Sequence, residues 1–256
     1  MATAVQGTQS FARSIALLRH IADRSASPTL QDLLRECGLT RPSLYRMLAG
    51  LEAEGLVTQT SDKRYLPGPG LISLARKALA GQDVRALARP ALERLRDATG
   101  ETVHLAVRSG DEMVYIEKIE SQQSVRMAST IGTRVPFHST GVGKAYLAAL
   151  DAQAAEALMQ TLDLPQVTPL TATDLETLRA RVTQARKDGY VFDDQENELG
   201  IVCYGGAVLE ALNEPIACLS VSVPLYRHAD APATYRDPLL ECIAELSSLQ
   251  GFEQPS

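Results

Sequence analysis

The chain has 256 residues, of which 45% are hydrophobic, and it carries a formal net charge of −6. This length allows one large or two modest domains with a full hydrophobic core. No run of apolar residues approaches the roughly 20 that span a bilayer, and no basic segment followed by an apolar one marks a secretory signal. We therefore expect a cytoplasmic protein with no membrane partner. The small and polar residues 1–9 are predicted to be a disordered tail.

Positive and negative charges are unevenly distributed along the chain. Residues 1–66 hold eight Lys or Arg and six Asp or Glu, for a net charge of +2, so the remaining residues carry −8. A weakly basic head on an acidic body is compatible with a small nucleic-acid-binding module attached to a larger domain that does not bind nucleic acid.

The four cysteines fit neither a zinc module nor a disulfide framework, because none of them forms a closely spaced pair. They are Cys37, Cys203, Cys218 and Cys242. We expect most of them to be small buried hydrophobic residues, and we expect no metal and no cofactor.

Two short helices are predicted near the start of the chain. Residues 10–24 carry apolar side chains at helical spacing, namely Phe11, Ile15, Leu18 and Ile21. Residues 30–37 follow, with Thr29 and Asp32 in a capping-box arrangement and Gly38 at the end.

A third helix is predicted over residues 41–54. Thr40 can cap its start, Pro42 is compatible with its first turn, and Gly55 can end it. Its apolar face consists of Leu44, Leu48 and Leu51. Alone, this pattern fits a capped surface helix equally well. The helices at residues 30–37 and 41–54 are short and joined by a tight turn, and the later one has polar and basic residues at its start. This arrangement is typical of a helix-turn-helix.

A hairpin is predicted directly after this third helix. Residues 56–60 and 63–66 are β-prone and are separated by a turn, with Lys63 and Arg64 at the tip. A hairpin in this position is typical of a winged helix-turn-helix, which we assign to residues 10–67. The Pro-Gly-Pro-Gly sequence at 67–70 marks a domain boundary, and residues 68–83 are predicted to contain a linker helix.

Double-stranded DNA is the expected partner of this domain. The start of the third helix would offer its side chains to bases in the major groove, and basic residues nearby would contact phosphates. The candidate DNA-binding residues are Arg13, Thr40, Arg41, Ser43, Tyr45, Arg46, Lys63 and Arg64.

The remaining residues, 84–256, are predicted to form an α+β domain with a mainly antiparallel sheet. Helices are expected at residues 84–99, 142–149, 152–162, 174–187 and 238–249. Strands are expected at residues 103–107, 113–119, 125–129, 190–192, 201–211 and 216–223. The alternation at 103–107 predicts a strand that is buried on one face only.

Two stretches of this domain resemble signatures of the IclR-type transcriptional regulators. Residues 132–145 (GTRVPFHSTGVGKA) are similar to G-x-x-x-P-x-H-x-T-x-x-G-K-A, and residues 189–203 are similar to G-[YW]-x-x-D-x-E-E-x-x-x-G-x-x-C. The resemblance extends from about Phe11 to about Leu249. The chain departs from the family pattern at Gln195, where an acidic residue is usual, and at residues 41–44, where a Ser-Thr pair is more common.

This resemblance implies a winged-helix repressor or activator with a GAF-like effector domain. Such a protein acts as a homodimer or a dimer of dimers on a palindromic operator, and a small organic acid bound to the C-terminal domain alters operator binding. The positions that match the family's pocket are Met127, Val135, Gly141, Val142, Asp193, Ile201, Cys203, Ser220 and Ser222. Outside this set, we expect Lys144 to be a helix-surface or salt-bridge residue and His138 to be a structural histidine.

Two other functions remain open at this point. Cys203, His138 and Asp193 are a nucleophile, a base and an orienting group by residue type, but no nucleophile elbow or phosphate-binding loop accompanies them, so we expect no catalytic residue. The second alternative is a constitutive DNA-binding protein whose C-terminal domain only dimerises.

Overall fold

The computed structural model describes residues 8–24, 26–74, 84–124, 127–228 and 232–251. The chain divides into two compact units, Met1–Gln82 and Asp83–Ser256. Nearly all of the predicted tail, and residues 75–83 of the predicted linker, lie outside the described residues, whereas residues 70–74 are helical. No helix within the described ranges is long and apolar enough to cross a membrane.

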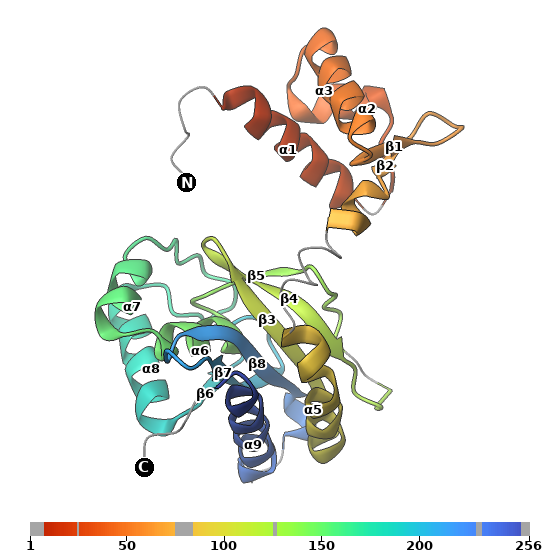
Figure 1. The fold of residues 1–256 in the computed structure, drawn as a ribbon. Helices are drawn as coiled ribbons and strands as arrows, with labels where there is room; N and C mark the ends of the chain where they lie inside the picture. Colours follow the sequence, from red (N-terminus) through yellow and green to blue (C-terminus); the bar gives the residue numbers. More distant parts are fainter. Residues whose placement is uncertain (1–7, 25, 75–83, 125–126, 229–231, 252–256) are drawn as a thin grey trace. The chain divides into compact units, whose positions relative to one another are not determined.

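The N-terminal unit contains the predicted helices and hairpin (Figure 1). Its elements are α1 (Gln9–Ala22), α2 (Leu30–Cys37), α3 (Arg41–Ala53), β1 (Val57–Gln59) and β2 (Tyr65–Pro67). The two strands pair antiparallel. Their core consists of buried Leu17, Ile21, Leu33, Leu44, Leu48, Leu51, Val57 and Tyr65. Phe11 was expected on the apolar face of α1 but is 68% exposed, because α1 packs through Leu17 and Ile21, one turn apart.

Local hydrogen bonds explain where these helices begin and end. The predicted capping box of α2 is confirmed, since the Asp32 N–H donates to Thr29 Oγ1 over 3.3 Å and the Thr29 N–H donates to Asp32 Oδ2 over 3.0 Å. The predicted cap of α3 is wrong: the Thr40 hydroxyl donates to Ser43 Oγ over 2.9 Å and accepts no backbone N–H. Gly55 has a φ of 66°, as expected after a helix end.

The Pro-Gly-Pro-Gly segment packs against the end of α3 and the start of the hairpin. The Gly68 N–H donates to Leu56 O over 2.8 Å, and the Gly70 N–H donates to Gly55 O over 2.9 Å. A Cβ atom on Gly68 would lie 2.2 Å from Gly55 O, so only glycine permits this close packing. The division between the units falls further along, between Gln82 and Asp83.

The C-terminal unit is built on a six-stranded sheet of order β5-β4-β3-β8-β7-β6, in which every neighbouring pair is antiparallel. The strands are β3 (Thr102–Ser109), β4 (Glu112–Ile119), β5 (Arg134–Pro136), β6 (Val191–Asp194), β7 (Ile201–Leu209) and β8 (Pro215–Pro224). The helices are α5 (Val84–Thr99), α6 (Gly141–Ala149), α7 (Ala152–Met159), α8 (Leu175–Asp188), the 3₁₀ turn η1 (Leu225–Arg227) and α9 (Ala233–Leu249). The predicted α+β class is confirmed.

Helices cover both faces of this sheet (Figure 1). On β7, a Cβ atom on Gly205 would lie 2.5 Å from Gly141 O of α6, whereas one on Gly206 would lie 2.3 Å from Ile243 Cδ1 of α9. Neighbouring residues of a strand point to opposite faces, so α6 and α9 lie against opposite faces. The central strand β3 is therefore buried on both sides from Thr102 to Ala106, and the prediction of a half-buried strand is wrong.

The largest differences from the sequence prediction in the C-terminal unit concern two elements. Of the strand predicted at 125–129, residues 127–129 form no strand and residues 125 and 126 lie outside the described residues. The strand that pairs with β4 at this edge of the sheet is β5. Helix α9 begins at Ala233, and Pro238 lies inside it. Its extra first turn is stabilised by Tyr235, whose ring stacks on Tyr204 at 5.5 Å and whose hydroxyl donates to Arg227 O over 3.1 Å.

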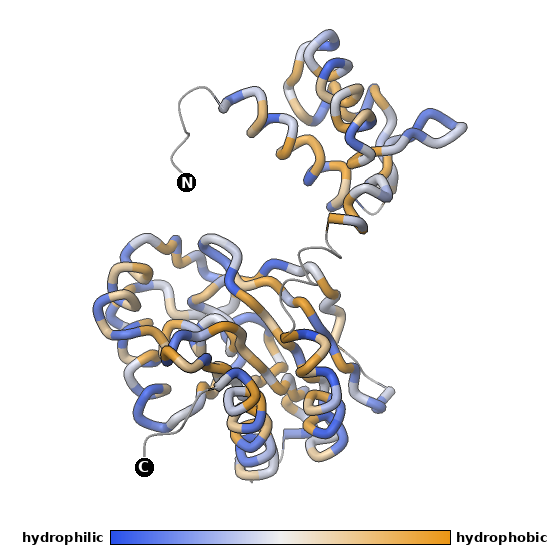
Figure 2. The backbone as a smooth tube through the Cα atoms, in the orientation of Figure 1, coloured by the Kyte–Doolittle hydropathy of each residue, from blue (hydrophilic) through white to orange (hydrophobic). Residues whose placement is uncertain are grey.

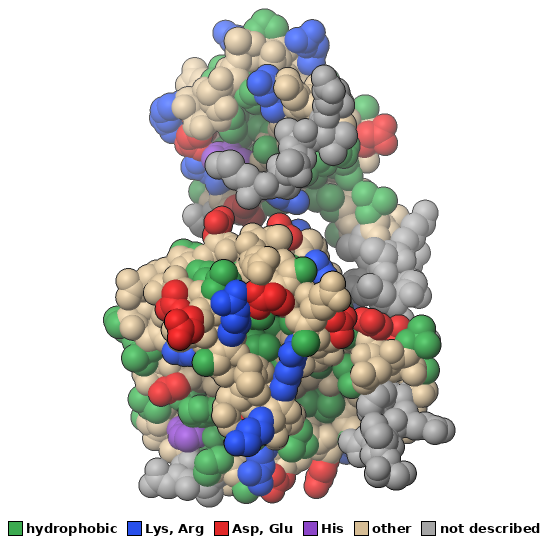
Figure 3. Space-filling model, turned by 90° about the vertical axis from the view of Figure 1, so that its left-hand side faces the viewer, with side chains coloured by type: hydrophobic (Ala, Val, Ile, Leu, Met, Phe, Trp, Pro, Cys, Tyr) green, Lys and Arg blue, Asp and Glu red, His purple; other side chains and the backbone are tan. Residues whose placement is uncertain are grey.

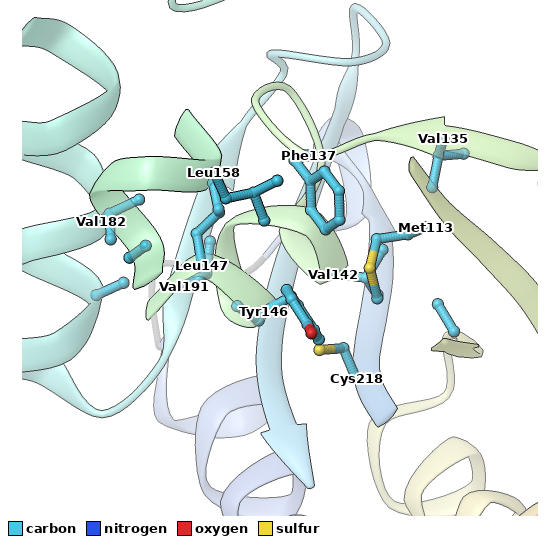
Figure 4. Close-up of a cluster of buried hydrophobic side chains, with 14 of the residues drawn as sticks. Met113, Val135, Phe137, Val142, Tyr146, Leu147, Leu158, Val182, Val191 and Cys218 are labelled. Carbon is cyan, nitrogen blue, oxygen red and sulfur yellow. The ribbon is translucent and has the colours of Figure 1, made fainter. Parts of the chain in front are cut away.

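A large hydrophobic cluster lies between the sheet and helices α6, α7 and α8. Figure 4 shows Phe137, Val142 and Tyr146 beside Met113 and Cys218 in this cluster. Hydrophobic stretches coincide with the central strands and with the inner faces of the helices (Figure 2). The side chain of Val142 is thus core, with 1% of its surface exposed.

Candidate DNA-binding surface and ligand cavity

The start of α3 presents an exposed polar and basic surface. Thr40, Arg41 and Arg46 are exposed, Tyr45 is 47% exposed, and Ser43 is half-buried. The Arg41 guanidinium lies over the Tyr45 ring, 5.9 Å from its centroid. The apolar residues of the same helix point into the core, so the first turn and a half of α3 is available to a partner, as in a recognition helix.

Helix α1 adds a basic residue to this surface. Arg13 of α1 lines a groove of about 640 Å³ together with Ser43 and Arg46 of α3. Two of the predicted DNA contacts on α3 and the predicted contact on α1 therefore lie along one groove of the N-terminal unit.

The two basic residues of the hairpin differ in their surroundings, although both are exposed. Arg64 Nε donates to Asp62 Oδ2 over 3.1 Å, and its Nη1 donates to Ser27 O over 2.8 Å. Lys63 has a φ of 64° and lies at the turn, in the hydrophilic tip of the hairpin (Figure 2). Arg64 thus attaches the hairpin to the loop before α2, and Lys63 is the better candidate for a phosphate contact.

Basic side chains near α2 are paired with acids. Arg24 and His20 bind Glu36, and Arg35 binds Asp32 over 3.0 Å. The hydrogen bond from Arg24 is the largest cause that lowers the pKa of Glu36 to about 2. In the described part of the N-terminal unit, the positive charge that is not paired in this way is therefore carried by α1, α3 and the hairpin, on Arg13, Arg19, Arg41, Arg46 and Lys63.

A cavity of about 220 Å³ lies in the C-terminal unit, between the sheet and the start of α6. It is lined by every residue that the sequence proposed for the effector pocket except Val142: Met127, Val135, Gly141, Asp193, Ile201, Cys203, Ser220 and Ser222. Val142 follows Gly141 on α6 and is therefore rotated by about 100° toward the core.

Seven further lining residues were missed from the sequence. They are His104, Tyr115, Ser129, Thr133, Thr140, Asn197 and Glu198. A signal for His104 was present: it is a polar residue in a strand, and its neighbour across the sheet is Ser220. The loop residues carry no comparable signal, because their position depends on how the loops fold over the sheet.

The N-terminus of α6 faces this cavity. Thr140 caps the helix, since its Oγ1 accepts the Gly143 N–H over 3.1 Å while the hydroxyl donates to Pro136 O over 2.7 Å. A Cβ atom on Gly141 would lie 3.3 Å from the Cys203 Cβ. The positive end of the α6 dipole thus borders the cavity at Gly141, the first residue of the helix.

Burial controls the ionisation of the groups in the cavity. Desolvation raises the pKa of Asp193 to about 6, against the opposing charge of Lys144. Burial lowers the pKa of His104 to about 3, and its ring is hydrogen-bonded to Ser129 Oγ at 2.7 Å and to Ser222 Oγ at 3.4 Å. His104 is therefore a neutral imidazole at physiological pH.

Cys203, His138 and Asp193 do not form a catalytic triad, because His138 does not line the cavity that contains the other two. Burial raises the pKa of the Cys203 thiol to about 12, so it is not a thiolate at neutral pH. His138 Nε2 is hydrogen-bonded to Pro165 O at 3.0 Å, in agreement with the structural role expected for it. No group of His, Cys, Asp and Glu that could hold a metal ion is found among the described residues.

Behind the cavity, three buried charged side chains, Lys144, Asp193 and Glu196, form a cluster that the partly exposed Arg181 joins. Lys144 binds Glu196 and lies 3.6 Å from Asp193 Oδ1, and Arg181 of α8 binds the same Oε1 atom of Glu196. Lys144 is 1% exposed, so the surface position considered for it is wrong and the salt-bridge role is confirmed.

The outer surface of the C-terminal unit has no comparable basic region on the face shown in Figure 3, where acidic and basic side chains are interspersed. This distribution agrees with a DNA contact through the N-terminal unit.

Comparison with known proteins identifies the family of both parts of the chain. The model described as "IclR helix-turn-helix domain" matches residues 10–61, and the model described as "Bacterial transcriptional regulator IclR C-terminal" matches residues 76–248. The chain is 32% identical over 225 residues to the HTH-type transcriptional repressor AllR of Escherichia coli (strain K12), covering 88% of this chain and 83% of the relative.

A second relative and a crystal structure extend the likeness over nearly the whole chain. The transcriptional repressor IclR of Escherichia coli (strain K12) is 31% identical over 236 residues, with 91% of this chain and 86% of the relative covered. The crystal structure of Thermotoga maritima IclR is similar with a TM-score of 0.77 at 30% identity, covering 96% of this chain and 100% of that one. This chain therefore belongs to the IclR family of bacterial transcriptional regulators.

Proposed function

We propose that the protein is a transcriptional repressor that binds a palindromic operator as a homodimer or a dimer of dimers, and that a small organic acid in the cavity changes its operator affinity. The observation that carries this proposal is the cavity at the start of α6, in a chain that also presents an exposed basic recognition helix. The names of the two Escherichia coli relatives support repression.

Operator binding would use the N-terminal unit. The start of α3 enters the major groove with Arg41 and Tyr45 toward the bases, while Lys63 contacts a phosphate. One module makes few contacts, and phosphate contacts weaken with salt. Two modules related by a two-fold axis double the contacts, which leads to half-sites about 10 bp, or a multiple of it, apart.

Effector binding would use both the helix end and the polar wall of the cavity. A carboxylate placed at the start of α6 meets the backbone N–H groups near Gly141 and the positive end of the dipole. Ser220 and Ser222 can bond the ligand's remaining oxygens, and Asp193 can accept a bond from a hydroxyl group. A volume of about 220 Å³ is below the range of drug-sized sites, which favours a small metabolite.

The test combines thermal melting with DNA binding. A panel of small keto, hydroxy and aromatic acids is screened by melting temperature, and each hit is titrated into protein bound to a selected operator duplex. An acid at 100 times its Kd is expected to stabilise the folded protein by about 2.7 kcal/mol, or about 5–10 °C in Tm, and to change operator affinity, because a ligand shifts an equilibrium only by binding the two states differently.

Two serine variants locate the binding site. Ser222→Ala in the cavity should weaken the hit at least fivefold, whereas Ser248→Ala, an exposed serine of α9, should not. If no acid binds and operator affinity never changes, the protein is a constitutive DNA-binding dimer and the proposal of an effector fails.

A further inference from the structure

A second and larger hollow lies at the β6 edge of the sheet and shares no lining residue with the cavity. Its volume is about 610 Å³, within the range of small-molecule sites. Helix α8 forms one wall with Arg181, Gln184, Ala185 and Asp188. Lys144, Tyr190, Val191, Phe192, Tyr204, His228 and Pro232 complete the lining. We call this hollow the edge groove.

Aromatic rings dominate one side of the edge groove. The Tyr204 ring lies 6.0 Å from that of Tyr190 at 19°, and 5.2 Å from that of Phe192. Its hydroxyl is hydrogen-bonded to His228 Nε2 at 2.8 Å. Phe192 is nonetheless 44% exposed. These rings are held in place by one another, so a planar ligand could stack on them with little cost in side-chain entropy.

The two cations at the charged end of the groove are already paired, and the Asp188 carboxylate accepts hydrogen bonds from Gln184 Nε2 over 2.7 and 2.8 Å. Lys144 and Arg181 both bind Glu196 Oε1, and Lys144 also lies near Asp193. The other oxygen, Glu196 Oε2, is buried and is the one side-chain atom of the described residues found buried without a hydrogen-bond partner. Such an atom costs free energy until a donor reaches it. Asp188 adds a second carboxylate to the groove.

An anionic ligand does not suit this arrangement. A carboxylate would have to separate Lys144, which is 1% exposed, from the carboxylates that neutralise it, and breaking a buried ion pair is expensive. A positively charged group, in contrast, is attracted by the carboxylate of Asp188 and by the negative faces of the rings.

We propose that the edge groove is a second ligand site, separate from the effector cavity, and that it binds a planar aromatic amine. The ring of the ligand stacks on Phe192 and its amino group is directed toward Asp188. This proposal does not rest on the effector proposed above, because the two sites share no lining residue, although Lys144 of the groove lies 3.6 Å from Asp193 of the cavity.

The experiment measures binding of two matched probes to the full chain by isothermal titration calorimetry. Tyramine and 3-(4-hydroxyphenyl)propionate share a phenol ring and a similar length but carry opposite charges. Tyramine is expected to bind one molecule per chain and at least tenfold more tightly than the acid. Phe192→Ala should weaken tyramine at least tenfold, and Asp188→Asn at least threefold.

Leu225→Ala is the matched control, because Leu225 is also 44% exposed but does not line the groove; it should bind tyramine as the natural chain does. Circular dichroism melting checks that all variants are folded. Equal binding of acid and amine, or unchanged tyramine binding by Phe192→Ala, would overturn the proposal. Loss of tyramine binding in Ser222→Ala but not in Phe192→Ala would also overturn it, because tyramine would then occupy the cavity. If the natural chain does not bind tyramine and Phe192→Ala changes the mass measured by sedimentation, the groove is an interface between copies of the chain and the proposal is likewise overturned.

Discussion

Single buried side chains decide how the cavity responds to charge. Asp193 is 2% exposed, accepts the Glu196 N–H over 3.0 Å and lies 3.6 Å from Lys144 Nζ. Although a cation stands nearby, desolvation is the larger effect and the pKa of Asp193 rises to about 6. The cavity can therefore take up a proton on Asp193 just below neutral pH, which reduces its repulsion of an anionic ligand.

Asp193 should make the stability of the folded protein depend on pH. Its pKa in the folded protein, about 6, is higher than its ordinary value of 3.8, so the folded state binds more protons between these values. The free energy of unfolding then falls as the pH rises from about 4 to about 7, by on the order of 3 kcal/mol for a shift of about two units.

Asp193→Asn removes this dependence. In urea unfolding followed by circular dichroism, the stability of Asp193→Asn relative to the natural chain should increase from pH 5 to pH 7.5. Asp194→Asn serves as a control, because Asp194 is the exposed neighbour on the same strand. A relative stability that is constant over this range would contradict the raised pKa.

The cavity residues also show what the sequence could and could not predict about single side chains. Asp193, Cys203 and Ser222 were placed by matching motifs, and they do lie around one cavity. Val142 was misplaced, because a motif gives the position in sequence but not the direction of a helical side chain. The burial of Lys144 was missed because its partner Glu196 lies 52 residues away.

Helices and strands were predictable where local patterns determine them. Helix α5 begins and ends as predicted, and the α2 capping box follows from two side chains three residues apart. Strand β5 and the first turn of α9 depend instead on tertiary contacts, namely the pairing of Val135 with Met113 and the stacking of Tyr235 on Tyr204. These contacts join distant parts of the chain and leave no local signal.

Two adjacent glycines of β7 provide a matched test of how closely α6 packs on the sheet. Gly205→Ala would place a Cβ 2.5 Å from Gly141 O, a backbone atom at the start of α6. Gly206→Ala meets only the tip of the Ile243 side chain, which can rotate. We expect Gly205→Ala to destabilise the protein by about 2–3 kcal/mol and Gly206→Ala by less than about 1 kcal/mol.

The measurement is the melting temperature of each variant, together with binding of the acid identified for the cavity. Because Gly205→Ala must displace Gly141, it should also weaken that acid, whereas Gly206→Ala should not. Equal destabilisation by the two substitutions would show that α6 is not in direct backbone contact with β7.

Over the whole chain, charge is divided between two units with different tasks. The net charge is +2 over residues 1–66 and −8 over the rest, which agrees with DNA contact confined to the N-terminal unit. A module this small gains affinity by duplication, and the number of copies on the DNA can be counted through the salt dependence of binding. Each phosphate contact contributes about −0.9 to the slope of log K against log salt concentration.

Lys63→Ala should therefore report how many copies bind. If two chains occupy a palindromic operator, the substitution lowers the magnitude of the slope by about 2 on the full operator but by about 1 on a half-site duplex. Fluorescence anisotropy at four salt concentrations measures both slopes. Asp23→Ala, on an exposed acid just after α1, is a control that should not decrease either slope. An equal change of about 1 on both duplexes would mean that a single N-terminal unit reads the operator, and the two-fold arrangement would have to be abandoned.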